Sequence, residues 1–448
     1  MIRLSSIRDS FEGVIPSVIA TMDASGQPNI SYLSHIYYID ERHVALSNQF
    51  FSKTSENIRN SNRASAMVVS GRTGVQHILD ITFKESLQAG PLFDRLSAHL
   101  KAMGHAAGME EVMRLRAIDI FHVEDCRLVT PVAPLELPDP AKEDPGCDHL
   151  SRAALIVRDI GAELDPERMF DTALEGLNQR FGYPYALVSI PNEDEQKLVT
   201  IASMGYRDYG FGSEIPFGEG AIGVAAVSRQ PVRISDFSRG LRYVTAVQAT
   251  AGSMPDAVIP LPLLIAPLSQ LAVPMMVRGR LMGVLFVESE RNFAFDYRDE
   301  EALTIIATQL ATGLLLAERD SHDGEPAVVP PSPPEIERPA SRFLVRYFAH
   351  DGSLFIDDDY VIRGVPGRLL HHFLECYLAH GQQDFSNREI RRNRAIALPD
   401  FKDNLETRLI LLKRRLDEKG GPIRIERPER GRIRLEIRGV PQIDVVQS

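Results

Sequence analysis

The chain has 448 residues, of which 44% are hydrophobic and 25% charged, and its formal net charge is −11. This length predicts two or three domains, and the composition is typical of globular proteins with true hydrophobic cores. So negative a charge argues against non-specific nucleic-acid binding by the whole surface. No apolar run approaches a membrane span and the N-terminus has no apolar signal segment, so we expect a cytoplasmic protein. Cys126, Cys147 and Cys376 are too widely separated for a metal or disulfide framework.

Two proline-rich segments divide the sequence. We expect residues 133–148 and 320–340 to be linkers, the second an extended spacer, because proline restricts the backbone. The predicted domains are therefore 8–132, 149–319 and 341–439. Charge is unevenly distributed: from Ser341 onward 20 Lys and Arg face 16 Asp and Glu, although the whole chain is acidic. This asymmetry predicts a C-terminal unit with a partner of its own.

The first domain consists of short strands with two helices, a pattern that predicts a small antiparallel barrel. The predicted strands are 14–23, 29–34, 36–39, 43–47, 64–69, 76–85 and 117–123, and the predicted helices are 55–60 and 90–103. This order resembles the flavin-binding split barrel of the pyridoxamine 5′-phosphate oxidase-like superfamily. His122 is predicted to be an ordinary strand residue.

The segment Ser47-Asn-Gln-Phe-Phe-Ser-Lys-Thr-Ser-Glu-Asn-Ile carries this resemblance. A lysine charge, two hydroxyls and a helix N-terminus suit the oxygens of a phosphate group. The resemblance implies FMN as a cofactor, with phosphate contacts from Ser52, Lys53 and Thr54 and contacts to the ring or ribityl chain from Ser47 and Gln49. The plainer interpretation is a helix cap followed by solvent-facing charge. No basic cluster follows Phe121, so we name no catalytic residue and lean against oxidase activity.

The middle domain has its strongest motif at Ile215–Asp236. Gly218, Gly220 and Gly223 lie at a predicted turn and helix entrance, followed by a helix of small residues up to Ser228. The glycine spacing also fits a dinucleotide fingerprint, but no hydrophobic strand runs into Gly218, so we reject nucleotide binding. Around the motif we predict helices at 151–160, 166–181 and from 297, and strands at 185–190, 197–203, 232–236, 270–277 and 281–289.

The glycine motif and the closing segment 295–301 resemble a GAF domain. The resemblance implies a central α/β/α sandwich, a ligand pocket capped by the glycine turn, and a homodimer formed through the first and last helices. The long segment 237–267 is predicted to be a lid. We see no metal-ligand spacing, and His149 is expected to be a surface residue rather than a haem ligand. The sequence does not identify the GAF ligand.

The third domain is predicted to contain strands at 343–348 and 353–356, helices at 368–380, 386–393 and 400–419, and a basic hairpin at 423–426 and 432–437. It resembles the winged-helix output domain of response regulators, which implies that the third helix enters the DNA major groove and the hairpin reaches the minor groove. The resemblance implies DNA contacts from Lys402, Asn404, Thr407, Arg408, Arg414, Arg430 and Arg432. Phosphate contacts are expected from Arg388, Arg391, Arg392 and Arg394, because guanidinium groups bind phosphate without reading sequence.

Ile410 and Leu411 depart from that pattern. They are expected to face outward where the family has polar or basic residues, and an exposed apolar pair favours a protein contact. The plainer alternative is a solvated basic helix on a small interaction domain.

The sequence thus predicts a multidomain α+β protein with an N-terminal split β-barrel, a central GAF α/β/α sandwich and a C-terminal winged helix. Our leading hypothesis is a cytoplasmic, homodimeric one-component transcriptional regulator, in which the barrel and the GAF domain sense redox state or a small molecule and control DNA binding. The alternatives are an FMN-dependent oxidoreductase regulated by its GAF domain and a purely protein-binding scaffold.

Overall fold

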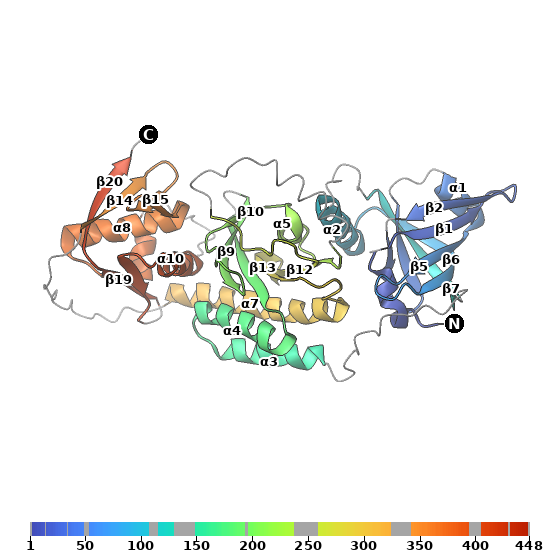
Figure 1. Ribbon diagram of the computed structural model, residues 1–448, viewed down its shortest axis with the longest axis horizontal. Coiled ribbons are helices and arrows are strands. Elements are labelled where there is room, and N and C mark those ends of the chain that lie inside the picture. Colours follow the sequence, from blue (N-terminus) through green and yellow to red (C-terminus); the bar gives the residue numbers. More distant parts are fainter. Residues whose placement is uncertain are drawn as a thin grey trace.

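The computed structural model describes residues 2–13, 15–33, 35–48, 53–106, 115–129, 148–192, 196–236, 259–323, 342–393, 405–428 and 431–446. Three domains follow one another in chain order along the long axis of the molecule (Figure 1). Residues 237–258 of the predicted lid and most of both predicted linkers lie outside the described residues.

The first domain is a curled, seven-stranded antiparallel sheet in the order β2-β1-β5-β6-β7-β4-β3. Alternate side chains of its strands point into a core around Ile19, Leu46, Leu79 and Phe121, which are all almost fully buried. The predicted strands and helices of this domain are confirmed. Their bounds are η1 Leu4–Phe11, β1 Ser17–Met22, β2 Pro28–Leu33, β3 Ile36–Tyr38, β4 His43–Asn48, α1 Lys53–Ser61, β5 Arg63–Val69, β6 Gln76–Leu87, α2 Pro91–Ala106 and β7 Ala117–Leu128.

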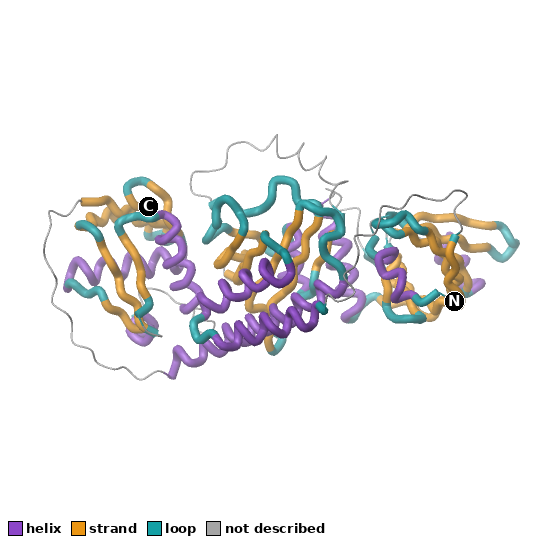
Figure 2. Tube along the Cα trace, turned by 60° about the horizontal axis from the view of Figure 1, so that its bottom comes forward, coloured by secondary structure: helices purple, strands orange, loops and turns teal. Residues whose placement is uncertain are grey.

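The middle domain is a six-stranded antiparallel sheet in the order β10-β9-β8-β13-β12-β11. Its long helices α3, α4 and α7 run side by side along one face (Figure 2), and α5 covers the other. The bounds are α3 His149–Ala162, α4 Pro166–Gly176, η2 Leu177–Phe181, β8 Tyr185–Asn192, β9 Lys197–Met204, β10 Glu214–Pro216, α5 Gly220–Ser228, β11 Val232–Ile234, β12 Ser269–Val277, β13 Arg280–Ser289 and α7 Tyr297–Asp323.

The glycine motif forms the predicted turn and helix entrance. Gly218 and Gly220 have φ angles of +87° and +59°, which side-chain-bearing residues rarely adopt. A Cβ on Gly223 would lie 2.3 Å from the carbonyl oxygen of Pro216, so only glycine lets α5 approach this closely.

Helix α2 links the first domain to the second. Figure 1 shows it between the two sheets, and its Ala98 and Ala102 are buried in one cluster with Ile222 and Ala225 of α5. The small side chains on both helices allow this close packing. The outer face of the middle sheet is therefore covered jointly by its own α5 and by a helix of the preceding domain.

One described helix segment, Tyr297–Glu318 in α7, is long and apolar enough to cross a membrane by length and composition, contrary to our expectation from apolar runs. Its apolar stripe is nevertheless packed on the middle sheet, where Leu303, Ile306 and Leu310 are fully buried. This burial is the arrangement of a core helix, and such helices satisfy the same composition test.

The third domain begins with a four-stranded sheet in the order β16-β15-β14-β20, continues with α8, α9 and α10, and has a second sheet in the order β17-β19-β18. Strands β16, β17 and β20 were not predicted, and β20 pairs in parallel with β14 beyond residue 439. Leu405, Leu409, Leu412 and Leu416 recur at helical spacing within the predicted helix 400–419, and all four are buried. The bounds are β14 Arg342–Phe348, β15 Ser353–Ile356, β16 Asp359–Ile362, α8 Gly364–His380, β17 Asp384–Ser386, α9 Asn387–Arg392, α10 Leu405–Lys419, β18 Ile423–Glu426, β19 Arg432–Ile437 and β20 Val440–Val446.

Candidate functional site

Helix α10 has two buried faces. Its first face packs in the third domain, and its second face lies against the middle domain. Ile410 is fully buried in the core cluster of the middle domain, and Leu411 is buried in one cluster with Val199 and Phe211 of that domain. The expectation that Ile410 and Leu411 face outward is therefore wrong, because the middle domain covers them. Their apolar character was the signal in the sequence that this face meets a protein surface.

Arg414 lies on this second face and is only 7% exposed. Its guanidinium donates to a carboxylate oxygen of Asp171 at 2.6 Å and to the backbone oxygens of Glu167 at 3.1 Å and Ile201 at 3.3 Å. It also lies 5.6 Å from the ring centroid of Phe211. All these partners belong to the middle domain, so Arg414 binds across the domain interface.

Further polar contacts surround Arg414. The Lys413 ammonium is 2.9 Å from Glu167, and Arg408 donates to the side-chain oxygen of Asn192 at 3.2 Å. Arg427, which follows β18, pairs with Asp165 at 3.4 Å and with Glu406 of α10. The predicted recognition helix is thus held by the carboxylates and carbonyls of α4 and of the middle sheet. The sequence offered no sign of these acidic partners.

The predicted DNA contacts fall into three groups. Thr407 and Arg414 are buried and Arg408 is half-buried against the middle domain, so none of the three is open to DNA in this arrangement, and their DNA contacts stay a prediction. In the second group, Arg388 is exposed on α9, while Arg391 on α9 and Arg432 on β19 are half-buried. Arg392 ends α9, whereas Lys402, Asn404, Arg394 and Arg430 lie outside the described residues.

The predicted flavin site is described in part. Lys53 begins α1 and is exposed, so its ammonium and the helix N-terminus fit a phosphate group. Thr54 is buried, and its hydroxyl bonds to Asn29 at 3.0 Å and Ser31 at 2.8 Å of β2. Ser47 is also buried and donates to the backbone oxygen of His35 at 3.2 Å, so its hydroxyl is already used within the fold. Gln49 and Ser52 lie outside the described residues.

A polar row crosses the α5-facing side of the middle sheet. Glu288 on β13 is paired in register with Gln270 on β12 and with Tyr185 on β8. Its carboxylate accepts the Leu264 N–H at 2.7 Å and the Gln270 amide at 3.1 Å. Burial raises the pKa of Glu288 to about 7, although these hydrogen bonds favour the charged form. The middle domain therefore contains a carboxyl group that titrates near neutral pH, and sequence reasoning missed it because only the fold buries it.

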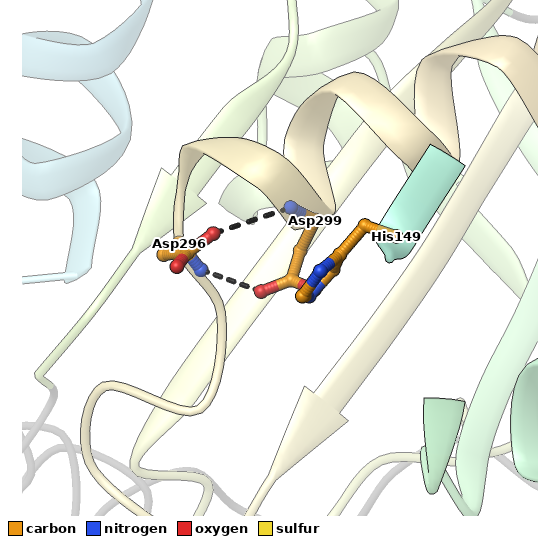
Figure 3. A group of neighbouring side chains, drawn as sticks. All are labelled: His149, Asp296 and Asp299. Atoms are coloured by element: carbon orange, nitrogen blue, oxygen red, sulfur yellow. Dashed lines mark hydrogen bonds and ion pairs between the residues drawn. The ribbon is translucent and has the colours of Figure 1, made fainter. Parts of the chain in front are cut away.

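His149, Asp296 and Asp299 lie together where α3 meets the start of α7 (Figure 3), with ligand atoms within 4.8 Å of one another. Asp296 and Asp299 exchange hydrogen bonds with each other's backbone N–H groups at 3.3 and 2.7 Å, as in a helix-capping pair. Tyr183 donates to Asp299 at 2.5 Å, and His149 Nε2 is 2.9 Å from the same carboxylate. His149 is thus half-buried rather than on the surface, and the capping geometry accounts for the cluster.

An ion-pair network joins the first two domains. Arg233 of β11 pairs with Glu12 of the first domain at 2.8 Å and with Glu300 of α7 at 3.4 Å, and Arg95 of α2 pairs with Glu300 as well. All but Arg95 are largely buried. A small cavity of about 80 Å³ lies beside the network.

Three polar aromatic side chains line this cavity. The His35 and Tyr37 rings stack with their centroids 3.6 Å apart, and His99 of α2 meets His35 edge-on at 5.1 Å. Burial lowers the pKa of His35 to about 4, so this imidazole is neutral at pH 7. The interface between the first two domains thus contains paired arginines and glutamates beside uncharged aromatic rings.

Comparison with protein families identifies two regions of the chain. Residues 6–123 match the model described as "Pyridoxamine 5'-phosphate oxidase", and residues 165–314 match the GAF domain model. The chain therefore contains a pyridoxamine 5′-phosphate oxidase-type domain followed by a GAF domain, as the sequence resemblances predicted. No curated protein matches the chain.

Several solved structures are similar to parts of the chain. Free methionine-R-sulfoxide reductase from Neisseria meningitidis is 22% identical, with a TM-score of 0.31, over 38% of this chain and 91% of that one. The GAF domain from Acinetobacter phosphoenolpyruvate-protein phosphotransferase is 20% identical, with a TM-score of 0.31, over 38% and 94%. An FMN-binding protein from Syntrophomonas wolfei is 16% identical, with a TM-score of 0.24, over 29% and 90%.

Proposed function

We propose that this protein is a cytoplasmic one-component transcriptional regulator whose barrel and GAF domain sense redox state or a small molecule and control a winged-helix DNA-binding output. The observation that carries the proposal is the burial of Arg414 on the middle domain, at the position expected of a DNA contact. The arrangement described here is then the resting state, in which the GAF domain covers the recognition helix α10.

The third domain supports the DNA-binding part through its elements and its charge. Three helices, α8 to α10, are followed by the hairpin β18–β19, the order expected of a winged helix. Cations outnumber carboxylates in this part of an otherwise acidic chain. Arg388 is exposed on α9, where it can bind a DNA phosphate even while α10 is covered.

Regulation follows from the shared interface. α10 cannot both pack on the middle domain and enter a major groove, so the docked and DNA-bound arrangements exclude each other. A signal that favours the undocked state shifts the population toward DNA binding by its difference in affinity for the two states. The interface includes apolar contacts as well as ion pairs, so docking persists when salt screens the charges.

FMN binding by the first domain is the second part of the proposal. Lys53 and the N-terminus of α1 would hold the FMN phosphate, with Ser52 next to them in sequence. Bound FMN would supply redox sensitivity. The hydroxyls of Ser47 and Thr54 would shape the site by fixing β4, β2 and α1 rather than by facing the ligand, because both are engaged within the fold.

Homodimerisation through α3 and α7 completes the model. Leu155 on α3 and Ile305 and Leu316 on α7 are exposed apolar residues on the helices that cover one face of the middle sheet. Pairing these helices with a second copy would bury them and bring two output domains together. Two joined domains suit the two half-sites of a palindromic operator.

The proposal is tested by DNA binding of the full-length protein. We expect salt-sensitive, sequence-selective binding to DNA upstream of its own gene, measured by fluorescence polarisation over a range of salt concentrations. Arg388→Ala should weaken binding to all sequences and reduce the salt slope by about 1. Arg346→Ala, which removes a cation that pairs with Asp358 in the first sheet of the domain, should leave the slope unchanged. Failure of DNA binding by both the wild type and an undocked variant such as Asp171→Arg would overturn the proposal.

An FMN-dependent oxidoreductase regulated by its GAF domain is a second candidate function. The match of residues 6–123 to the pyridoxamine 5′-phosphate oxidase model favours it. A yellow preparation that oxidises NADH or NADPH would support this function. A colourless protein that FMN does not reconstitute would exclude it together with the flavin part of the regulator.

A further inference from the structure

A cleft of about 340 Å³ lies between the middle and third domains and is lined by Arg408 and Leu411 of α10. Its volume is within the range of roughly 300–1,000 Å³ that is typical of small-molecule sites. The middle domain contributes the ends of β8 and β10, including Asn192 and Glu214. The third domain contributes β16, the start of α8 and Arg408 of α10.

The charges of the cleft are unbalanced. Arg363, Arg368 and Arg408 line it from the third domain. Glu214 is the carboxylate on the opposite side, and it accepts from Arg363 Nε at 2.7 Å and from Lys197 Nζ at 2.7 Å. Among the described residues that line the cleft, the three arginines outnumber the two carboxylates, Glu214 and Asp351, by one charge without counting His350.

The start of α8 adds to this positive potential. Its N-cap residue Arg363 makes no side-chain capping hydrogen bond, and the Gly364 N–H donates to the backbone oxygen of Asp351 at 3.0 Å. Gly364 lines the cleft, so the positive end of the helix dipole lies at the cleft. The Cβ position of Gly364 points into open space, with no atom within 4 Å. Beside this polar end, the side chains of Tyr360, Ile362 and Leu411 form an apolar wall. The cleft thus has a cationic end and an apolar end.

We propose that this cleft binds a small phosphate monoester, and that its binding releases α10 from the middle domain. The phosphate would lie against Arg363, Arg368 and Arg408, because these cations outnumber the carboxylates of the described lining and guanidinium groups bind phosphate in a bidentate manner. The organic part would pack on the apolar wall. The regulatory half of this inference rests on the proposed function, whereas the binding half does not.

The release of α10 from the middle domain follows from the domain to which each charged residue belongs. The three arginines belong to the third domain, and the acidic group facing them, Glu214, belongs to the middle domain. A phosphate bound to the arginines replaces Glu214 as the partner of Arg363 and Asn192 as the partner of Arg408, and it repels the Glu214 carboxylate. Two contacts across the interface are lost, so the bound ligand separates the two domains and does not hold them together.

The binding half is tested by calorimetric titration of the full-length protein with phenyl phosphate, inorganic phosphate and phenol. We expect phenyl phosphate to bind, inorganic phosphate to bind more weakly and phenol not to bind. Arg368→Met should weaken phenyl phosphate binding by at least about tenfold, the loss expected for one charge-assisted contact. Arg346→Met, a matched loss of an arginine on β14 outside the cleft, should not.

Glu214→Gln distinguishes this cleft from an adventitious anion site. The substitution removes the competing carboxylate while keeping its size, so phenyl phosphate should bind several-fold more tightly. Unchanged or weaker binding to Glu214→Gln, or equal loss in Arg368→Met and Arg346→Met, overturns the proposal.

The regulatory half is tested by hydrogen exchange of α10, residues Leu405–Lys419. Saturating phenyl phosphate should speed exchange of this helix in the wild type. Binding of phenyl phosphate without faster exchange of α10 overturns the proposal that the ligand releases this helix. If phenyl phosphate binds and speeds exchange of α10 but the protein has no DNA affinity, the ligand-driven release of α10 stands and the proposed DNA-binding function is rejected. The failure of this inference and the failure of the proposed function are therefore distinguishable.

Discussion

The guanidinium of Arg414 donates to the carboxylate of Asp171 across 2.6 Å and joins α10 of the third domain to α4 of the middle domain. Asp171 is the more exposed partner, with 61% of its side chain accessible, whereas Arg414 is buried. Asp171 can therefore be changed without disturbing a core, while Arg414 cannot.

Asp171→Arg should undock α10 and increase DNA affinity. The new cation repels Arg414 and Lys413, and losing about 1.4 kcal/mol of docking free energy raises the apparent affinity about tenfold. Fluorescence polarisation with the cognate DNA measures the change. Glu301→Arg makes the same charge change at an exposed position of α7 and should have little effect. An Asp171→Arg protein that binds DNA no better than Glu301→Arg would show that docking does not limit DNA binding.

Arg233→Met should destabilise the junction between the first two domains by about 3–5 kcal/mol, because it removes the cation that pairs with the buried carboxylate of Glu12 and leaves Glu300 with the half-exposed Arg95. The chain has no tryptophan, so urea unfolding is best followed by circular dichroism. Arg291→Met, at an exposed position, serves as the control. Equal stability of the two variants would contradict a structural role for the network.

Glu288 should make stability depend on pH. Its folded pKa of about 7 is above the usual value of 4.5, so the folded state binds the proton more tightly than the unfolded state does. The free energy of unfolding therefore falls as pH rises from about 4.5 to 7, by about 3 kcal/mol from this group. Glu288→Gln keeps a neutral side chain and should flatten this fall.

The measurement is urea unfolding at several pH values between 5 and 8.5. The stability of Glu288→Gln relative to the wild type should grow with pH, and the exposed neighbour Glu290→Gln should show no such trend. A constant difference between Glu288→Gln and the wild type across this range would mean that Glu288 is already ionised at pH 5.

Lys53→Ala should weaken FMN binding. Loss of a charge-assisted contact to phosphate costs about 1.5–3 kcal/mol, or roughly 10–150-fold in affinity. Quenching of flavin fluorescence on titration into the apoprotein gives the dissociation constant. Arg59→Ala removes a cation from the other end of the same helix and should bind FMN as the wild type does. Equal affinities of all three proteins would place the phosphate elsewhere.

Local patterns in the sequence predicted most of the elements. The alternation of side chains along β5 and the four-three-four spacing of leucines from Leu405 to Leu416 depend only on residues a few positions apart. Both patterns could therefore be recognised without knowledge of the fold. The same is true of the glycines at 218, 220 and 223, because a turn and a close helix approach require glycine locally. Strand β20 could not be predicted in this way, since its partner β14 lies almost a hundred residues earlier.

By itself, therefore, the sequence determined the order and type of most of the elements and the families of two of the three domains. The tertiary structure alone decided what covers each functional side chain. The side chains of Ile410, Leu411 and Arg414 would suit a DNA groove, a partner protein or a neighbouring domain. Only the tertiary structure, in which the GAF domain packs against them, decides among these surfaces. Glu288 is likewise an ordinary glutamate in the sequence, and its raised pKa arises from burial by segments distant along the chain. Burial and charge pairing depend on contacts between distant residues, which a local pattern does not contain.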